Sequence, residues 1–354
     1  MKISFNEYDS KGRFFGVKKL MFHAMNNDSS LMRERLGYWL FRKMGVPAPR
    51  AVHVRLLING KYQGVFLNVE SLDDRFTKSH FSDKDGNLYK EIWPTSIEGF
   101  TEPLTAARWK SGLETNTDKS QSFDKALALG RAVIQDDGDA RARALQNGMS
   151  IANTVRYIAV DRAIGLDDGA SHLYCQEGRC GNHNFYVYEE EKASRFWLIS
   201  WDLDSSFVVS GSLADEGDAA QRIVKAWNDH SAVCEIGPGA SPHAVQQLPT
   251  ACDPLWNALG CYYQDGYRAA VAELLTGPFS DRQGPRWPWP SRCCYGRPWP
   301  RWAGTRSGQR RRSGSPAGRC TSSWGGAERA VRCVCGLGRA RRTGRHVAAR
   351  LREG

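Results

Sequence analysis

Acidic and amide side chains between residues 160 and 205 occur in the order that phosphoryl transfer requires. A helix expected to end near Gly165 leads into Leu166-Asp167-Asp168-Gly169, His183-Asn184 opens one strand, and Trp201-Asp202-Leu203-Asp204 closes the next. In kinase-type chemistry one Asp accepts the proton of the substrate hydroxyl, while an Asn and a second Asp hold Mg²⁺ on the ATP phosphates. Asp168, Asn184 and Asp202 are candidates for these roles. The alternative is that Asp168 lies in a simple turn and Asp202 only ends a strand.

A lysine and a glutamate near the N-terminus could complete a phosphate site. Lys18 and Lys19 lie on an expected strand, 15–22, that precedes an expected helix, 31–44. At 100° per residue Glu34 falls within the apolar arc of this helix, where a charge needs a partner. Lys18 is one candidate partner and would then be placed to touch phosphates. The alternative is that Glu34 pairs at the surface with an adjacent arginine, and such pairs are weak.

The spacing of apolar and turn residues predicts a chain that mixes strands and helices. Residues 1–70 indicate strand, strand, helix, strand, strand, with Asn59-Gly60 as a hairpin turn. Residues 71–120 are polar and show little periodicity. Further helices are expected near 122–135, 139–148, 150–165 and 263–276, and further strands at 184–188 and 195–201.

Charge and composition change near residue 280. The net charge is +11, but residues 281–354 hold 18 arginines, no lysine and three acidic residues, so this segment carries +15 and residues 1–280 carry −4. With few aliphatic side chains the segment cannot bury enough apolar surface to fold, and we expect a disordered tail. It is either a basic RNA-binding tail or, as its composition favours, an out-of-frame sequence. The acidic remainder gives no electrostatic reason to expect specific nucleic-acid binding.

Cysteine usage and hydropathy bear on the compartment. Five of the ten cysteines lie in residues 1–280, on polar stretches, which favours an oxidising compartment over free buried thiols. No apolar run approaches the ~18–20 residues of a membrane helix. We therefore expect no transmembrane segment, and the first residues show no signal peptide.

Four motifs together resemble the CotH (spore coat protein H) family. They are the segment from GVKKLMFHAMNND to NVESLDDRF at 16–76, DGNLYK at 85–90, HNFYVY at 183–188 and FWLISWDLDSSF at 196–207. The likeness covers roughly residues 1–280. The family is similar to protein kinases in fold and is regarded as an atypical protein kinase group.

The resemblance implies a role for several residues. Lys18, or Lys19 if the strand parity differs, would contact the ATP phosphates, with Glu34 as its helix partner. Glu70 would lie near the hinge that borders the adenine. By the same resemblance Asp168 would be the catalytic aspartate, and Asn184 and Asp202 the metal ligands. Lys90 matches the family without an assigned role.

The chain departs from the family pattern at three places. It starts at what looks like the second strand of the small lobe, so by the resemblance we expect the first strand and the phosphate-covering loop to be absent from this sequence. Residues 169–182 look like an insertion, which a disulfide between Cys175 and Cys180 would hold closed; a metal site with His172 and His183 is the alternative. The Arg-rich tail replaces the expected C-terminal continuation.

The predicted fold class is α+β, in a two-lobed protein-kinase-like arrangement. Residues 1–70 would form a truncated small lobe, 71–280 the large lobe and 281–354 the disordered or out-of-frame tail. The resemblance implies transfer of the ATP γ-phosphoryl group, with Mg²⁺ or Mn²⁺, to a Ser or Thr of a coat or envelope protein outside the cell or in the spore coat. The rivals are a catalytically inactive coat or envelope interaction protein and nucleic-acid binding through the tail.

Overall fold

The computed structural model describes most of the first 277 residues. The described residues are 1–95, 105–134, 138–166, 168–171, 173–176, 179–193, 195–207, 246–248 and 253–277, with backbone alone for 173–176, 179–180 and 246–248. The predictions for residues 281–354 lie outside this range.

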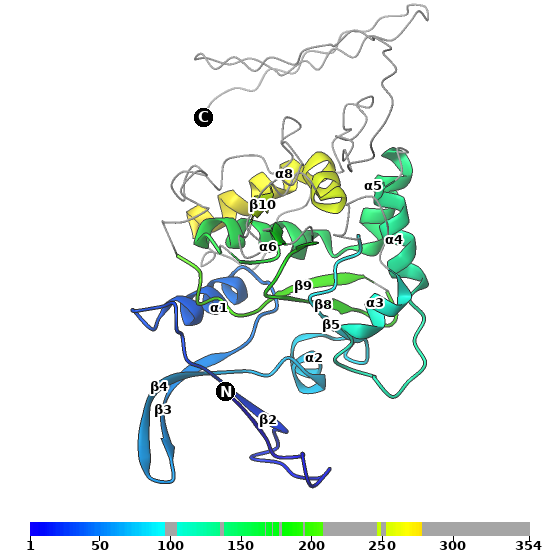
Figure 1. The fold of residues 1–354 in the computed structure, drawn as a ribbon. Coiled ribbons are helices and arrows are strands. Elements are labelled where there is room, and N and C mark those ends of the chain that lie inside the picture. The colour runs from blue at the N-terminus through cyan, green and yellow to red at the C-terminus, as the bar shows by residue number, and fades with distance from the viewer. Residues whose placement is uncertain are drawn as a thin grey trace, which may run out of the picture. The chain divides into compact units, whose positions relative to one another are not determined.

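A four-stranded antiparallel sheet forms from the first 70 residues (Figure 1). Its strands are β1 (Lys2–Ser4), β2 (Lys19–His23), β3 (Ala51–Ile58) and β4 (Lys61–Val69), in the order β1-β2-β4-β3. Asn59 and Gly60 join β3 to β4 with φ angles of 50° and 77°. This left-handed pair matches the twist of a two-residue hairpin, so the predicted turn is confirmed.

A second antiparallel sheet has two of the expected site residues, Asn184 and Asp202, next to one of its ends. Its strands are β5 (Asn87–Lys90), β8 (Phe185–Glu189) and β9 (Phe196–Ser200), in the order β5-β8-β9. Every residue of β8 is buried, and β9 is buried except for the half-buried Trp197. A further small sheet has the order β10-β6-β7, from β6 (Leu173–Gln176), β7 (Arg179–Gly181) and β10 (Gln246–Leu248).

Helices pack around these sheets. They are α1 (Arg33–Lys43), α2 (Asp74–His80), α3 (Ala106–Ser111), α4 (Asp124–Ile134), α5 (Gly138–Gly148), α6 (Ile151–Ile164) and α8 (Pro254–Thr276). The central one is α6, which contacts α1, β9 and α8. It ends at Gly165, whose φ of 56° supplies the left-handed C-cap.

The mixed α and β composition confirms the coarse fold class, while the two-lobed kinase-like arrangement stays a prediction. The segment expected to lack periodicity, 71–120, contains α2, β5 and α3, elements of four to seven residues that are too short to show a period. Helix α8 starts at Pro254, earlier than the expected 263. Among the described helices, none combines the length and apolarity needed to cross a bilayer.

Asp253 fixes the start of α8. Its fully buried carboxylate accepts hydrogen bonds from the Trp256 N–H (2.8 Å), Trp93 Nε1 (3.1 Å) and Thr95 Oγ1 (3.0 Å). This N-cap therefore also links α8 to the end of the segment that follows β5.

Replacing Asp253 by Ala should lower the free energy of unfolding by about 2–4 kcal/mol, because three buried donors lose their acceptor. Urea unfolding of the full chain measures this. Asp265→Ala is the matched control, since Asp265 lies on the same helix in an exposed pair with Arg268, and it should cost less than about 0.5 kcal/mol. Equal losses in the two variants would contradict the assigned role of Asp253.

Candidate active site

Asn184 and Asp202 lie at the same end of the β8–β9 hairpin. Phe185 and Ser200 are register partners, and one step further the Trp201 N–H donates to the Asn184 carbonyl at 3.0 Å. Asn184 and Asp202 have φ angles of 53° and 50°. Asn and Asp tolerate this left-handed region better than other non-glycine residues. Two residues of types that can ligate a metal thus lie at the same end of the hairpin, where both strands end.

Glu34 lies behind Asp202 and is fully buried in the first turn of α1. Its Oε1 accepts a hydrogen bond from the Tyr38 hydroxyl at 3.0 Å and lies 2.6 Å from His23 Nδ1. The Tyr38 hydroxyl in turn accepts the Asp202 N–H at 3.0 Å. One tyrosine therefore joins the helix glutamate to the backbone of the proposed metal ligand.

The expected ion pair between Lys18 and Glu34 is wrong. Lys18 Nζ lies 3.0 Å from Asp74 Oδ1, and both side chains are more than a third exposed. His23 contacts Glu34 instead, because side chains alternate along a strand and Lys18 has the opposite parity. Lys19 shares the parity of His23 but lies four residues earlier, about 13 Å away along the strand.

The surface alternative for Glu34 is also excluded. Arg33 lies 3.5 Å from Asp28, and Arg35 contacts the ring of His53. The interpretation of Glu34 as a buried charge with a partner is therefore the one that the structure supports, with histidine and tyrosine in place of lysine.

Asp202 is held in an acidic surrounding. The pKa of Asp202 is raised to about 6. Burial, the charge of Glu34 and the charge of Asp204 raise it, and the charges of His23 and Lys90 oppose this rise. His23 Nδ1 lies 3.7 Å from Asp202 Oδ1, and the Asp202 side chain is 45% exposed. A carboxylate with this environment gains from a nearby cation.

Burial lowers the pKa of His23, but the hydrogen bond and charge of Glu34, followed by the charge of Asp202, outweigh it, so the pKa lies above the ordinary value. The imidazole also packs edge-on against the ring of Trp201, with centroids 5.1 Å apart. Histidine is thus fixed between two carboxylates.

Lys90 ends β5 beside the same hairpin end. It is the register partner of Tyr186 on β8, and its charge acts on Asp202. The next residue, Glu91, has a φ of 50°, and its Oε1 accepts the Asn184 N–H at 3.2 Å. The sheet therefore brings a lysine and a second carboxylate to the edge that carries Asn184 and Asp202.

Asp168 lies half-buried in the loop after α6. Asn182 Nδ2 donates to the Ala170 carbonyl at 3.1 Å, which joins this loop to the segment that leads to Asn184. At the other side, the Phe207 N–H donates to the Ile164 carbonyl at 2.5 Å. Contacts at the end of α6 thus hold the loops of Asp168 and Asp202, while the catalytic role of Asp168 stays a prediction.

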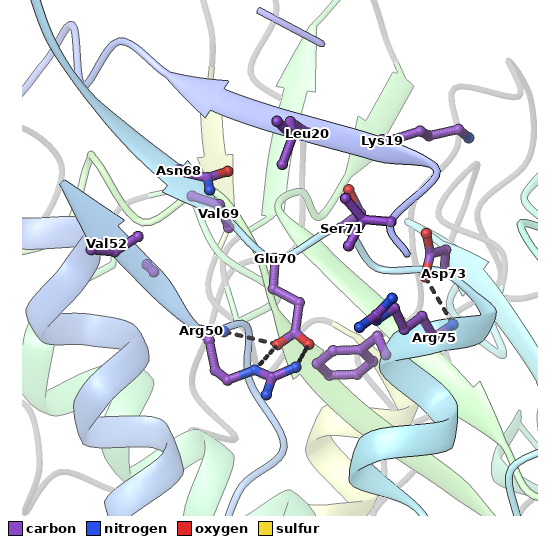
Figure 2. Close-up of a pocket in the computed structure, with 13 residues that line it drawn as sticks. Lys19, Leu20, Arg50, Val52, Asn68, Val69, Glu70, Ser71, Asp73 and Arg75 are labelled. Carbon is purple, nitrogen blue, oxygen red and sulfur yellow. Dashed lines mark hydrogen bonds and ion pairs between the residues drawn. The ribbon is translucent and has the colours of Figure 1, made fainter. Parts of the chain in front are cut away.

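Glu70 follows β4 and lines a cavity of about 290 Å³ (Figure 2). Figure 2 shows its carboxylate directed at Arg50, whose Nε lies 3.1 Å away and whose Nη2 also donates to it. His80 Nε2 lies 3.3 Å from the same carboxylate. Burial raises the pKa of Glu70, but His80 and Arg50 outweigh it and hold the pKa at about 2.

The cavity has mixed apolar and charged walls from β2, β3, β4 and α2. Its lining includes Lys19, Leu20, Asn68, Ser71 and Arg75. It lies against the residues that follow β4, the segment expected to form the hinge. The role of Glu70 in nucleotide binding stays a prediction, and its observed contacts give it a structural role in any case.

Cys175 and Cys180 are direct register partners across β6 and β7. Paired residues in antiparallel strands have Cα separations within the range that a disulfide accepts. Their side chains lie outside the described residues, so the disulfide stays a prediction. Cys261, on α8, is disulfide-bonded.

Three residues of the site were not anticipated: His23, Tyr38 and Glu91. His23 lies one residue beyond the strand expected at 15–22, so no role was assigned to it. Tyr38 lies four residues after Glu34, where side chains on a helix face each other, and this spacing was the available signal. Glu91 follows Lys90, the last residue of the family-like segment 85–90, but no sequence pattern distinguishes Glu91 as a site residue.

The chain belongs to the CotH kinase protein family, whose model matches residues 1–283. Two proteins of Bacillus subtilis (strain 168) are similar to it. It is 45% identical over 56 residues to the inner spore coat protein H-like protein, covering 16% of this chain and 18% of that protein. It is 22% identical over 194 residues to inner spore coat protein H, covering 55% of this chain and 51% of that protein. The chain thus matches at most about half the length of either relative.

The Glu70 contacts predict a pH-dependent contribution to stability. The pKa of Glu70 is lower in the folded chain than its ordinary value of 4.5, so the contribution is complete above pH 4.5 and is lost as the pH falls towards 2. Glu70→Gln should lower the free energy of unfolding by about 1–2 kcal/mol at pH 7, since Arg50 is largely exposed and screened.

Urea unfolding of both proteins between pH 3 and 7 measures this difference, which should shrink on acidification. Glu7→Gln, at an exposed position, controls for the change of net charge. A difference that stays constant, or grows, at low pH would mean that Glu70 is not held as an ionised group.

Proposed function

We propose that this chain is a metal-dependent phosphotransferase that moves the γ-phosphoryl group of ATP to a Ser or Thr hydroxyl of a protein. The observation that carries the proposal is that Asn184 and Asp202 flank the same end of the β8–β9 hairpin, with the charge of Lys90 acting on Asp202. Membership of the CotH kinase family supports it. The chain's membership of this family does not depend on the proposal.

The side chains present fit a divalent ion. Asp202 offers a partly exposed carboxylate whose pKa burial and the charge of Glu34 raise, and Asn184 stands at the neighbouring strand end. When bound, Mg²⁺ or Mn²⁺ supplies charge neutralisation of the ATP phosphates. Asp202 and Asn184 would hold the ion, and Tyr38 fixes the Asp202 backbone.

The remaining roles follow from position. Lys90, rather than Lys18, would supply the positive charge towards the phosphates, because Lys18 is paired with Asp74. Asp168, in the loop after α6, would accept the proton of the acceptor hydroxyl. The cavity beside Glu70 and Ser71 would receive part of the nucleotide.

The similar proteins are inner spore coat proteins by name, which suggests association with a spore coat. We propose that the acceptor is a protein of a coat or cell envelope. The rival is a coat component that keeps this fold for interactions without catalysis.

Asp202→Ala should reduce phosphate incorporation at least 100-fold, because the main metal ligand is lost. The measurement is transfer of radiolabelled phosphate from ATP, with Mg²⁺ or Mn²⁺, to the chain itself and to a generic protein acceptor. Asp118→Ala, at an exposed position, should match the unmodified chain. Equal incorporation by the unmodified chain and Asp202→Ala would end the enzyme proposal, and incorporation by neither would favour the non-catalytic rival.

A further inference from the structure

Three potential metal ligands from three separate elements converge behind the hairpin end. They are His23 at the end of β2, Glu34 in the first turn of α1 and Asp202 after β9. One ligand atom of each lies within 4.8 Å of the others. The His23 Nδ1 atom is 2.6 Å from Glu34 Oε1 and 3.7 Å from Asp202 Oδ1.

One oxygen of the buried glutamate is unsatisfied. Glu34 Oε1 contacts Tyr38 and His23, but Oε2 has no hydrogen-bond donor among the described residues, and the residue is 0% exposed. A buried carboxylate oxygen without a partner is costly, and a cation beside it would remove that cost. This is a second, independent reason to expect a ligand at the cluster.

The cluster has a route from solvent. Asp202 is 45% exposed and His23 is 13% exposed, while Glu34 closes the inner side. An ion can therefore approach from the side of Asp202, and His23 and Glu34 complete its coordination from the buried side.

The donor types decide the class of ion. One imidazole nitrogen and two carboxylates suit divalent ions of the manganese-to-zinc series, whereas Mg²⁺ and Ca²⁺ prefer oxygen donors alone. Two carboxylates also neutralise the charge of a divalent ion. The competing interpretation is that a protonated His23 bridges the two acids as an ion pair only.

We propose that His23, Glu34 and Asp202 form a binding site for a divalent transition-metal ion, with Mn²⁺ as the test ion. The inference rests on the proposed function only in taking Asp202 as a metal ligand; it needs neither ATP nor phosphoryl transfer. It extends the site inwards, from Asn184 and Asp202 to a histidine and a helix glutamate.

The test titrates the full chain, freed of metal with a chelator, with Mn²⁺ alone, and follows the EPR signal of the free ion. One Mn²⁺ should bind per chain, and pulsed EPR of the bound ion should show the ¹⁴N modulation of a coordinated imidazole. His23→Gln should weaken the apparent Kd at least tenfold. His53→Gln is the matched control, because that ring, on β3, contacts the Leu31 carbonyl and Arg35 and not this cluster.

Two results would overturn the site. One is Mn²⁺ bound with no ¹⁴N modulation, which needs no variant and so holds even if His23→Gln does not fold. The other is Mn²⁺ bound only in the presence of ATP and equally by His23→Gln and the unmodified chain. In that second case the metal lies with the nucleotide on Asn184 and Asp202, so the proposed function survives while this inference fails.

Discussion

The structure around the site depends on one buried carboxylate. Glu34 is fully buried in α1, and a charge in that position must be satisfied by nearby groups. Tyr38 on α1 and His23 on β2 meet this requirement for Oε1 alone, and the same tyrosine hydroxyl accepts the backbone N–H of Asp202. The first sheet, the helix and the end of the second sheet are thereby joined through a few polar atoms.

Close packing reinforces this junction. A Cβ atom at Gly37 would lie 2.7 Å from the Leu203 side chain, so α1 can approach the segment after Asp202 only because residue 37 has no side chain. Glycine inside a helix costs about 1 kcal/mol relative to alanine. The burial of Leu203 and Tyr38 offsets this cost. An alanine at position 37 would require the Leu203 side chain or the helix to shift.

Sequence reasoning located the long elements well because their signals are local. The helix of Glu34, the Asn59-Gly60 hairpin and the two strands that carry Asn184 and Asp202 follow from periodicity and turn residues. The partner of Glu34 could not be predicted in the same way. Apart from the buried Phe22, every residue of β2 is half-buried, so neither face stands out as the one towards α1. The opposite parity turns Lys18 away, and His23, five residues further along, contacts Glu34.

The early start of α8 was missed for a different reason. Its first turn is set by Asp253, whose partners Trp93 and Thr95 are distant in sequence. The short α2, β5 and α3 likewise depend on tertiary contacts; Tyr89 of β5, for example, donates to Glu189 of β8 at 2.9 Å. Local sequence patterns therefore predict poorly those elements that residues distant in sequence stabilise.

The candidate site therefore combines the residues that the family resemblance implies at the hairpin end with a histidine and a glutamate behind them. Asn184, Asp202 and Lys90 meet at the hairpin end, whereas Glu70 is occupied by Arg50 and His80 at the edge of the cavity. The proposed function requires that Asp202 be held firmly, and the Tyr38 hydroxyl holds its backbone N–H.

Hydrogen exchange at the Asp202 amide in the unmodified chain and in Tyr38→Phe tests this claim most directly. The Asp202 N–H should be protected in the unmodified chain and exchange at least tenfold faster in the variant. The amide of Leu198, which donates to Asn153 at 2.9 Å, should keep its protection in both proteins. An Asp202 amide that exchanges at the same rate with and without the tyrosine hydroxyl would contradict the account.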